Sequence, residues 1–402
     1  NIGLAQLKLG QFDQAIANTR KAIELNKAYT PAYLLLGQLY QMKNDNDTAK
    51  RAFRAALQED ANLWEAHLFL ARLYTKDATV QSCSQALGHL EQAQKIQPKN
   101  FEINMARGDT YLAMGNPADA RKEFQYVYQN NPQSPSVAIA LGKTYEKENN
   151  FKQAVTYYQQ ALQLKPDYPL AHVLLAGTHF AAGNLEQGFN EYEWRWKLSN
   201  MPNLTNKWDG SSLTGKRILI LSENGLDDII QYVRFIQLLK QQGAHTIAHV
   251  PKALVPLLKQ LDYVDEIVES GSENPPYDTI TSMQSIPFNT KINEKNLPNK
   301  PYLHADAKLV DLWHRKLAGD KHVKVGLVWH NGLDQKRTLE LTTLAPLAQN
   351  KKISFYSLQK DAPVNAPQEF SITSFEDFDT THGSFMDTAA IMKNLDLVIT
   401  TD

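Results

Sequence analysis

Two short polar segments carry the side chains best suited to chemistry. The first runs from Ser222 to Asp228 and ends on two aspartates, and the second runs from His330 to Arg337 and ends on a lysine and an arginine. A carboxylate placed in a loop can remove a proton from a hydroxyl group as a general base. Two cations in front of a helix can bind a diphosphate together with backbone N–H groups. The segments therefore predict a proton acceptor, Asp228, and an anion site.

Each of these side chains also has a simpler interpretation. Asp228 precedes apolar residues at helical spacing, where an aspartate commonly caps the helix. Lys336 and Arg337 are equally compatible with a solvated basic pair. His245 and His249 lie on one face of an expected strand, and because no further ligands accompany them we interpret them as structural and not as a metal site. The residue types alone leave both catalysis and helix capping open for Asp228.

Both polar segments follow apolar runs of strand length. Residues 216–222 and 323–329 are apolar enough to form strands buried on both faces of a parallel sheet. Such sheets bind ligands beyond the carboxyl ends of their strands, which is where the polar segments lie. We therefore expect two doubly wound α/β domains, with the segments that begin at Ser222 and His330 facing each other across a cleft. The other expected strands are 246–250, 264–268, 277–283, 353–358 and 397–401, and the expected helices are 229–239, 253–261, 341–347 and 386–394.

The first half of the sequence repeats with a period of about 34 residues. In the clearest copy Gly142 is followed by Tyr145 and Tyr158, and a shift by one period gives Gly108 with aromatic residues at the same offsets. The pattern resembles tetratricopeptide repeats, in which small residues let two antiparallel helices approach and aromatic residues fill the neighbouring groove. We count six copies in residues 1–198, the first incomplete, and expect a superhelix with a concave, peptide-sized surface.

Two details of the repeats carry predictions of their own. The copy that starts near Leu63 has extra residues around 79–82, which predict a longer loop between intact helices. The aromatic residues Tyr40, Tyr111 and Tyr145 occupy repeat positions, so we expect them to pack inside the stack and not to bind a ligand.

Composition narrows the class of protein. The chain has 402 residues, enough for two or three domains, and its 42 Lys and Arg balance 43 Asp and Glu, so no global positive charge attracts nucleic acid or an anionic membrane. The single cysteine, Cys83, favours a reducing, cytoplasmic compartment. No apolar run reaches the roughly 20 residues of a membrane helix. The G-x-G-x-x-G and G-x-x-x-x-G-K-[ST] patterns are missing, which disfavours a nucleotide-sugar dehydrogenase or epimerase.

Short motifs recur in a definite order from the end of the repeats to the C-terminus. They are Glu191 to Trp196, Trp208 to Gly210, Leu213 to Gly215, Ser222 to Arg234, Ser285 to Pro287, Pro301 to Leu303, Val325 to Trp329, Ser357 to Gln359, and Asp387 to Ala390 running on to Asp402. In this order they resemble bacterial tetratricopeptide-repeat glycosyltransferases. The catalytic part looks like the ADP-heptose:lipopolysaccharide heptosyltransferase family and is more distantly similar to protein O-GlcNAc transferases.

The resemblance implies a fold and an activity. The fold would be a tetratricopeptide solenoid over residues 1–198 and a connector over 199–215, followed by two Rossmann-like domains of GT-B type. These domains would cover residues 216–318 and 319–402, the second truncated. The activity would be inverting, metal-independent transfer of a sugar from a nucleotide-diphosphate donor to a protein or glycan recruited by the repeats. No cofactor and no metal are expected.

The resemblance also assigns roles to residues. Asp228 matches the aspartate of the family's G-L-G-D motif, which is taken as the general base. The acceptor side of the cleft would be formed by Asn224, Gly225 and Asp227. The donor would be bound by Asn331, Lys336, Arg337, Gln359 and Asp402.

The sequence departs from the family in ways that define an alternative. Asp227 replaces the motif's third residue, a glycine, and puts a second negative charge beside the proposed base. The chain starts at Asn1 without a methionine and ends at Asp402, before the family's histidine-bearing helix, so we expect a fragment that binds donor poorly and is inactive. The alternative is a tetratricopeptide protein-interaction scaffold with a degenerate, inactive transferase domain.

The repeats lack one device of the O-GlcNAc transferases. Those enzymes grip the peptide backbone with an asparagine ladder on the inner helices, so a peptide bound here would be held by another device. The corresponding positions here are Leu35, Phe69, Ala106, Ala140 and Leu174.

Overall fold

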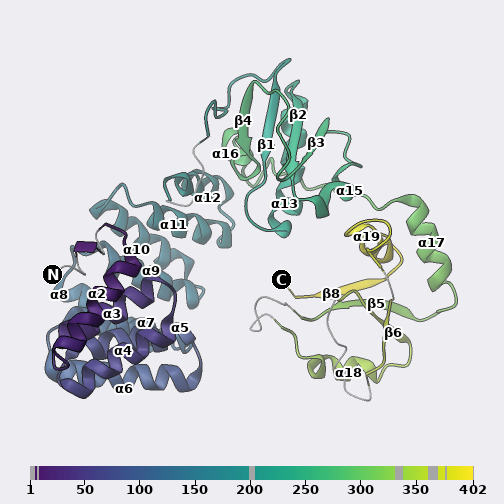
Figure 1. Ribbon diagram of the computed structural model, residues 1–402. Coiled ribbons are helices and arrows are strands. Elements are labelled where there is room, and N and C mark those ends of the chain that lie inside the picture. The colour runs from purple at the N-terminus through teal and green to yellow at the C-terminus, as the bar shows by residue number, and fades with distance from the viewer. Residues whose placement is uncertain are drawn as a thin grey trace. The chain divides into compact units, whose positions relative to one another are not determined.

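A computed structural model describes residues 5–6, 9–198, 204–330, 338–360, 370–375 and 378–401. The chain divides into two compact units, Asn1–Met201 and Pro202–Asp402 (Figure 1). The first unit contains helices and no named strand among its described residues, and the second contains two parallel sheets. No helix in the described ranges is both long and apolar enough to cross a membrane.

The helices of the first unit follow one another as pairs joined by short turns. In five of these pairs each helix packs on its partner, and α2 packs on the first helix of the next pair. The predicted helical repeat array is thereby confirmed. Its elements are α2 (Phe12–Leu25), α3 (Thr30–Met42), α4 (Asn46–Glu59), α5 (Trp64–Asp77), α6 (Val80–Ile96), α7 (Phe101–Ala113), α8 (Pro117–Asn130), α9 (Pro135–Lys147), α10 (Phe151–Leu164), α11 (Pro169–Ala181), α12 (Leu185–Tyr192) and the 3₁₀ helix η1 (Glu193–Lys197).

Close approach of the paired helices depends on a glycine that faces an aromatic ring. The ring comes from the second helix of the pair and covers the glycine of the first, leaving no room for a side chain there. A Cβ atom added at Gly37 would lie 2.4 Å from the ring of Phe53, and one added at Gly108 would lie 2.4 Å from the ring of Phe124. At Gly142 the distance to the ring of Tyr158 would be 2.5 Å.

The other aromatic repeat residues pack as expected. Tyr40, Tyr111 and Tyr145 are half-buried and contact the apolar clusters between neighbouring helices.

The extra residues near position 80 do not lengthen a loop, contrary to the prediction. Thr79 caps α6 in a capping box with Ser82, so the insertion extends this helix to 17 residues where α4 has 14.

The second unit begins with a four-stranded parallel sheet in the order β3-β2-β1-β4. Its first strand is buried on both faces, as its uninterrupted apolar sequence predicts, with Ile218, Leu219 and Ile220 fully inaccessible. The strands are β1 (Arg217–Leu221), β2 (His245–Val250), β3 (Glu266–Glu269) and β4 (Thr279–Ser282). The helical segments around them are α13 (Leu226–Tyr232), η2 (Val233–Phe235), α14 (Ile236–Gln241), η3 (Lys252–Leu254), α15 (Val255–Leu258), η4 (Met283–Ser285) and α16 (Ile286–Asn289).

A second four-stranded parallel sheet follows, in the order β7-β6-β5-β8. Both sheets thus place their first strand beside their last, the order found at the centre of doubly wound folds. The elements are α17 (Ala307–Leu317), β5 (Val323–Val328), η6 (Leu341–Leu344), α18 (Ala345–Ala348), β6 (Ile353–Ser357), β7 (Ile372–Ser374), α19 (Met386–Met392) and β8 (Leu397–Thr400).

Two parts of this unit differ from the pattern read along the sequence. Helix α17 and strand β7 were not predicted from the sequence. Residues in the expected connector also lie against the first sheet, because Trp208 N–H donates to Ile280 O at 2.8 Å and Ile280 N–H donates to Asn206 O at 3.1 Å. Trp208 is itself buried, so hydrophobic burial holds this stretch on the sheet.

Candidate functional site

A groove on the repeat array is a concave, mostly apolar site. Its volume is about 670 Å³, and its walls come from α2, the start of α3 and the facing side of α5. Leu25 and Tyr29 at its mouth are 80% and 45% exposed, although both are large and apolar. Lys21 and Glu65 also line it and place one charge of each sign on its surface. The rest of the lining is apolar except for Asn18, Thr19 and Gln38.

The floor of the groove is built into the core of the array. Phe69 lines the groove and also stacks on Phe53, with the ring centroids 5.1 Å apart, so the repeat packing holds its ring in place. Leu35 lines the same groove. Leu35 and Phe69 are two of the positions at which the sequence lacks an asparagine ladder, and both present apolar side chains to the groove.

The residues of the groove were not predicted as a site from the sequence. Leu25 ends α2, Tyr29 is the N-cap of α3 and Phe69 lies in α5, and only the fold brings Phe69 to the other two. A usable signal was present, since Leu25 and Tyr29 are large apolar residues that fall outside the repeat positions and would remain exposed.

The loop after β1 gathers four of the predicted site residues. Asn224 has a left-handed backbone with φ 58°, Gly225 is the N-cap of α13, and Asp227 and Asp228 lie in its first turn. The N-cap of α13 is Gly225, so Asp228 is not the N-cap residue that the capping interpretation expected. Its side chain forms a hydrogen bond with Asn224 instead.

The electrostatics of this loop raise the proton affinity of Asp228. Burial, followed by the neighbouring carboxylates of Asp227 and Glu223, raises the pKa of Asp228, and a hydrogen bond with Asn224 opposes the shift. The carboxylate of Asp227 lies over Gly225. A Cβ atom added at Gly225 would be 2.4 Å from Asp227 Oδ1. The carboxylate of Asp227, next to burial, therefore raises the proton affinity of Asp228.

The loop lies at the carboxyl edge of the first sheet, between the first and last strands. Ser222 N–H donates to His249 O at 3.2 Å, and the buried Gln284 after β4 donates from Nε2 to Glu223 O at 3.2 Å. This point, where the strand order reverses, is where open parallel sheets bind ligands. The geometry of the loop thus suits a small-molecule site.

Of the five residues predicted to bind the donor, the structure describes one, Gln359. Gln359 follows β6, and its Oε1 atom accepts a hydrogen bond from His330 N–H at 3.0 Å, across the carboxyl edge of the second sheet. Thr338 Oγ1 lies 3.2 Å from His330 Nδ1. The remaining donor residues fall outside the described residues, so a facing pair of loops stays a prediction; they are Asn331, Lys336, Arg337 and Asp402.

Asp387 is a buried carboxylate beside the second sheet that was not predicted as a site residue. Asp387 accepts hydrogen bonds from Trp313 Nε1 at 2.7 Å and from Asp379 N–H at 3.0 Å, and its Oδ2 lies 3.0 Å from His382 Nδ1. Burial works to raise the pKa of Asp387, but these donors outweigh it and lower the pKa. Asp387 therefore holds α17 to the turn before α19.

Metal binding has little support in the described residues. No group of three or more histidine, cysteine, aspartate or glutamate side chains within them is arranged around a common point. His245 Nε2 lies 2.6 Å from Glu266 Oε1, and Arg217 approaches the same carboxylate atom at 2.8 Å. This ion-pair cluster agrees with a structural role for His245.

The fold of the first unit defines a class of protein, the helical-repeat proteins. Two family models match it: a tetratricopeptide repeat-like domain over residues 11–141 and a tetratricopeptide repeat over residues 145–188. The first unit is therefore a tetratricopeptide-repeat array. Neither match extends past residue 188 into the second unit.

Known proteins with similar sequences match only in part. BBSome complex member BBS4 of Bos taurus is 27% identical over 29% of this chain and 21% of its own length. Anaphase-promoting complex subunit CDC16 of Saccharomyces cerevisiae is 29% identical over 25% of this chain and 12% of its own length. The pilF structure from Pseudomonas aeruginosa has a TM-score of 0.41 and 21% identity, covering 49% of this chain and 89% of pilF. The chain spans about a fifth or less of the two curated relatives.

Proposed function

We propose that the repeat array is a protein-interaction scaffold whose partner inserts apolar side chains into the groove between α2, α3 and α5. The observation that carries this proposal is the exposure of Leu25 and Tyr29 beside a concave apolar site. An exposed apolar patch is costly in water and is typical of a docking surface. The two curated relatives are named as members of multiprotein complexes, which agrees with such a role.

The lining of the groove indicates what the partner segment contains. Leu35 and Phe69 offer no hydrogen bonds to a peptide backbone, so binding at these positions depends on burying apolar side chains of the partner. The amides of Asn18 and Gln38 can bond to polar groups of the partner beside them. Lys21 and Glu65 can each pair with an opposite charge that flanks the apolar side chains. The partner segment is therefore apolar at its centre with charged residues beside it.

Peptide selection tests the scaffold proposal. A phage-displayed peptide library is selected against the whole protein, and the peptides that bind are measured against two variants. Leu25→Glu puts a charge into the groove and should weaken binding at least tenfold. Val80→Glu is the matched control, because Val80 is 83% exposed and does not line the groove. If both variants lose the same peptide affinity, or if neither variant loses any, the groove does not bind the partner.

We further propose that the second unit transfers a sugar from a nucleotide-diphosphate donor, with Asp228 as the general base. The support is the position of Asp228 at the point of strand reversal and its raised pKa. The two sheets would then be the paired domains of a GT-B fold, over residues 216–318 and 319–402. Lys336 and Arg337 would neutralise the leaving diphosphate.

The proposed reaction is a single displacement. The acceptor hydroxyl oxygen attacks the anomeric carbon as Asp228 takes its proton, and the bond from that carbon to the diphosphate oxygen breaks. The nucleoside diphosphate leaves with the electron pair, and the configuration inverts. A base with a raised pKa suits this step, because it holds the transferred proton more firmly.

A donor panel tests sugar transfer. The full-length protein is incubated with UDP-, GDP-, CMP- and ADP-sugars, and release of the nucleotide is measured with and without acceptor. Asp228→Asn should remove at least 99% of turnover, in line with the usual contribution of a general base. Asp262→Asn, an exposed aspartate outside the loop, is the control. Unchanged turnover in Asp228→Asn would exclude the carboxylate from the mechanism.

A further inference from the structure

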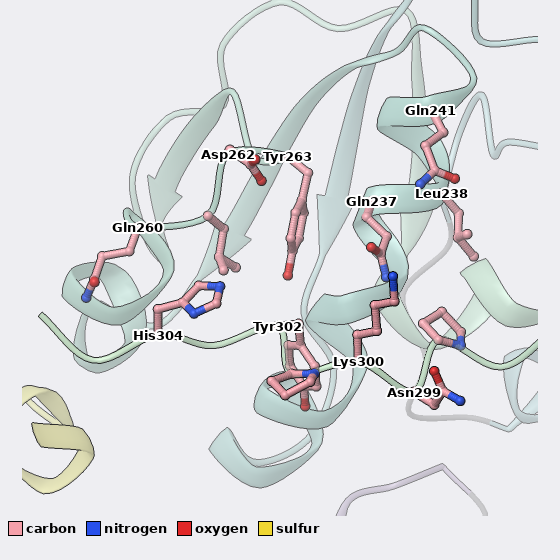
Figure 2. A pocket seen from close by; sticks show the side chains of 13 residues that line it. Gln237, Leu238, Gln241, Gln260, Asp262, Tyr263, Asn299, Lys300, Tyr302 and His304 are labelled. Atoms are coloured by element: carbon pink, nitrogen blue, oxygen red, sulfur yellow. The ribbon is translucent and has the colours of Figure 1, made fainter. Parts of the chain in front are cut away.

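A cavity of about 530 Å³ beside α14 in the second unit does not call for a ligand (Figure 2). Two of its polar side chains are already paired inside the protein, because Gln260 Nε2 donates to Met386 Sδ at 3.5 Å and Tyr302 Oη donates to Ile230 O at 2.9 Å. The repeat array differs in this respect, since one of its faces carries charged side chains that have no partner among the described residues.

Three charged side chains form a row across the array. Arg72 of α5, Asp109 of α7 and Lys143 of α9 each follow directly on the small residue of the repeat pattern, so they occupy the same position in three successive helix pairs. All three residues are exposed. Helix α7 packs on both α5 and α9, so the row crosses neighbouring helices. It presents charges in the order positive, negative, positive.

The row continues the groove of the proposed docking site. Gln38 occupies in α3 the position that Arg72 occupies in α5, and Gln38 lines the groove. Phe69, at the floor of the groove, is replaced at the same repeat position by Ala106 in α7 and by Ala140 in α9, and both alanines are buried. A partner segment that leaves the groove along the array therefore meets smaller floor residues flanked by charges.

Asp109 lies in a recess between two cations. The residue is exposed to water, yet the surrounding protein raises the pKa of its carboxyl group, as expected for a side chain at the bottom of a concave surface. The positive charges of Lys143 and Arg72 oppose this shift, but neither forms an ion pair with Asp109. Arg72 is instead 3.1 Å from Glu102, in an exposed pair of small energetic value. The carboxylate of Asp109 is thus open to a cation from a partner.

The cations at the two ends of the row are doubled. Lys76 follows Arg72 by four residues and Lys147 follows Lys143 by four residues, so each pair lies on one face of its helix. Both additional lysines are exposed, and the equivalent residue of α7 is Ala113. Two cations at one place attract a carboxylate more strongly than one does. The row therefore matches a segment with acidic residues at both ends and a basic residue between them.

The distance between the helices selects the conformation of such a segment. Helices in contact lie about 8–10 Å apart, which is roughly the step from one charge of the row to the next. In a polyproline II helix, residues three apart share a face and are separated by about 9 Å. Residues on one face of a β-strand are about 7 or 13 Å apart and match this step less well.

We propose that the row of Arg72, Asp109 and Lys143 binds a polyproline II segment of the partner in which an acidic, a basic and an acidic residue follow one another at intervals of three. The inference rests on the proposed scaffold function and names a second part of the partner, because apolar side chains would fill the groove while these charges pair along the row. A polyproline II segment is ordered before it binds, so little conformational entropy is lost.

Synthetic peptides test the proposal on the whole protein by fluorescence anisotropy. All have a polyproline background, and the matched peptide carries glutamate, lysine and glutamate at intervals of three. A second peptide carries the opposite signs, and a third carries the matched charges at intervals of four. The matched peptide should bind about tenfold more tightly than either of them, as expected for several exposed pairs acting together, and added salt should weaken its binding.

A charge exchange assigns the contact. Asp109→Lys should weaken the matched peptide about fivefold and strengthen by a similar factor a peptide with glutamate at all three charged positions. Lys143→Glu should weaken both of these peptides. Glu59→Lys is the matched control, because it makes the same change of charge at an exposed position on α4, the second helix of its pair. It should leave the preference between the two peptides unchanged.

Three results would overturn the proposal. The first is that the matched peptide does not bind. The second is that it binds no better than the peptide with opposite signs or the peptide with intervals of four. The third is that Asp109→Lys shifts the peptide preference no more than Glu59→Lys does. Leu25→Glu should not affect these peptides, because they carry no segment for the groove. Failure of the groove and failure of the row are therefore distinguishable.

Discussion

The ring of Phe124 in α8 lies directly on Gly108 in α7, so that a Cβ atom at the glycine would be 2.4 Å from the ring. The same arrangement joins two further helix pairs of the array. Neither helix of a pair buries its apolar face alone, and the glycine sets how close the two helices come. The groove on the array depends on this spacing, because its floor, Phe69, stacks on one of the rings that cover a glycine.

A single methyl group at this position should therefore destabilise the array. Gly108→Ala should lower the free energy of unfolding by about 1–3 kcal/mol, because the ring of Phe124 has no room to move aside. Gly88→Ala is the control: this glycine lies in α6 with no atom within 4 Å of an added Cβ, so alanine should stabilise the helix by about 0.5–1 kcal/mol. Urea unfolding of both variants measures the difference. Equal effects would contradict the account of the helix spacing.

Two histidines in the array should make its stability depend on pH. His67 Nδ1 lies 2.9 Å from His89 Nδ1, and burial, with the nearby charges of His67 and Arg54, lowers the pKa of His89 to about 4. The unfolded chain has a pKa of about 6.5 at this residue, so it binds the proton first as the pH falls. Stability should be constant above pH 6.5 and fall between about 6.5 and 4.

The size of this effect is limited because the ring is only half-buried. We expect a loss of about 1–2 kcal/mol across the window, less than the whole pKa difference would give. Unfolding measured from pH 7 downward should show a shallower slope in His89→Gln. The exposed His304 provides the control variant His304→Gln, whose slope should match that of the unchanged protein. A His89→Gln slope as steep as the original would refute the assignment.

The repeat array could be predicted because its pattern is local. Gly108 and the aromatic residues that follow it recur at a constant offset, and each copy forms one helix pair. Helix α17 carries an equally local pattern, because Asp306 caps it and Leu309, Trp313 and Leu317 lie on one face. This helix could therefore also have been predicted from the sequence.

The candidate sites could be predicted only in part. Asp228 follows a buried strand, and that order alone places it at the carboxyl edge of the sheet. The contact of His67 with His89 and the grouping of Leu25 with Phe69 depend on how separate helices pack. No local period encodes such contacts, so they appear only once the chain is folded.

The charge of Asp227 should set the pKa of Asp228. Its carboxylate is the second cause, after burial, of the raised pKa of Asp228, so Asp227→Asn should lower that pKa. Carbon-13 NMR of the aspartate carboxyl groups follows both titrations. Asp262→Asn, in the exposed turn before β3 and outside the loop, should leave the Asp228 titration unchanged. A pKa of Asp228 that stays the same in Asp227→Asn would show that the two carboxylates do not interact.

The buried carboxylate of Asp387 should hold the second sheet and its helices together. In Asp387→Asn an amide would face the N–H groups of Trp313 and Asp379, so at least one buried donor would lose its acceptor. We expect a loss of about 1–3 kcal/mol and a shift of the Trp313 indole N–H resonance. Asp311→Asn, an exposed change on the same helix α17, should alter neither. An unchanged indole resonance in Asp387→Asn would contradict the contact.

Photo-crosslinking tests the central claim most directly, namely that the groove on the repeats is where a protein partner docks. Tyr29 and Tyr126 are 45% and 44% exposed, but only Tyr29 lines the groove. Each is replaced in turn by benzoylphenylalanine and irradiated with a selected peptide, and the products are mapped by mass spectrometry. The account predicts efficient crosslinking from position 29, lost in Leu25→Glu, and little from position 126. Crosslinking that is equal from both positions, or stronger from position 126, would contradict it.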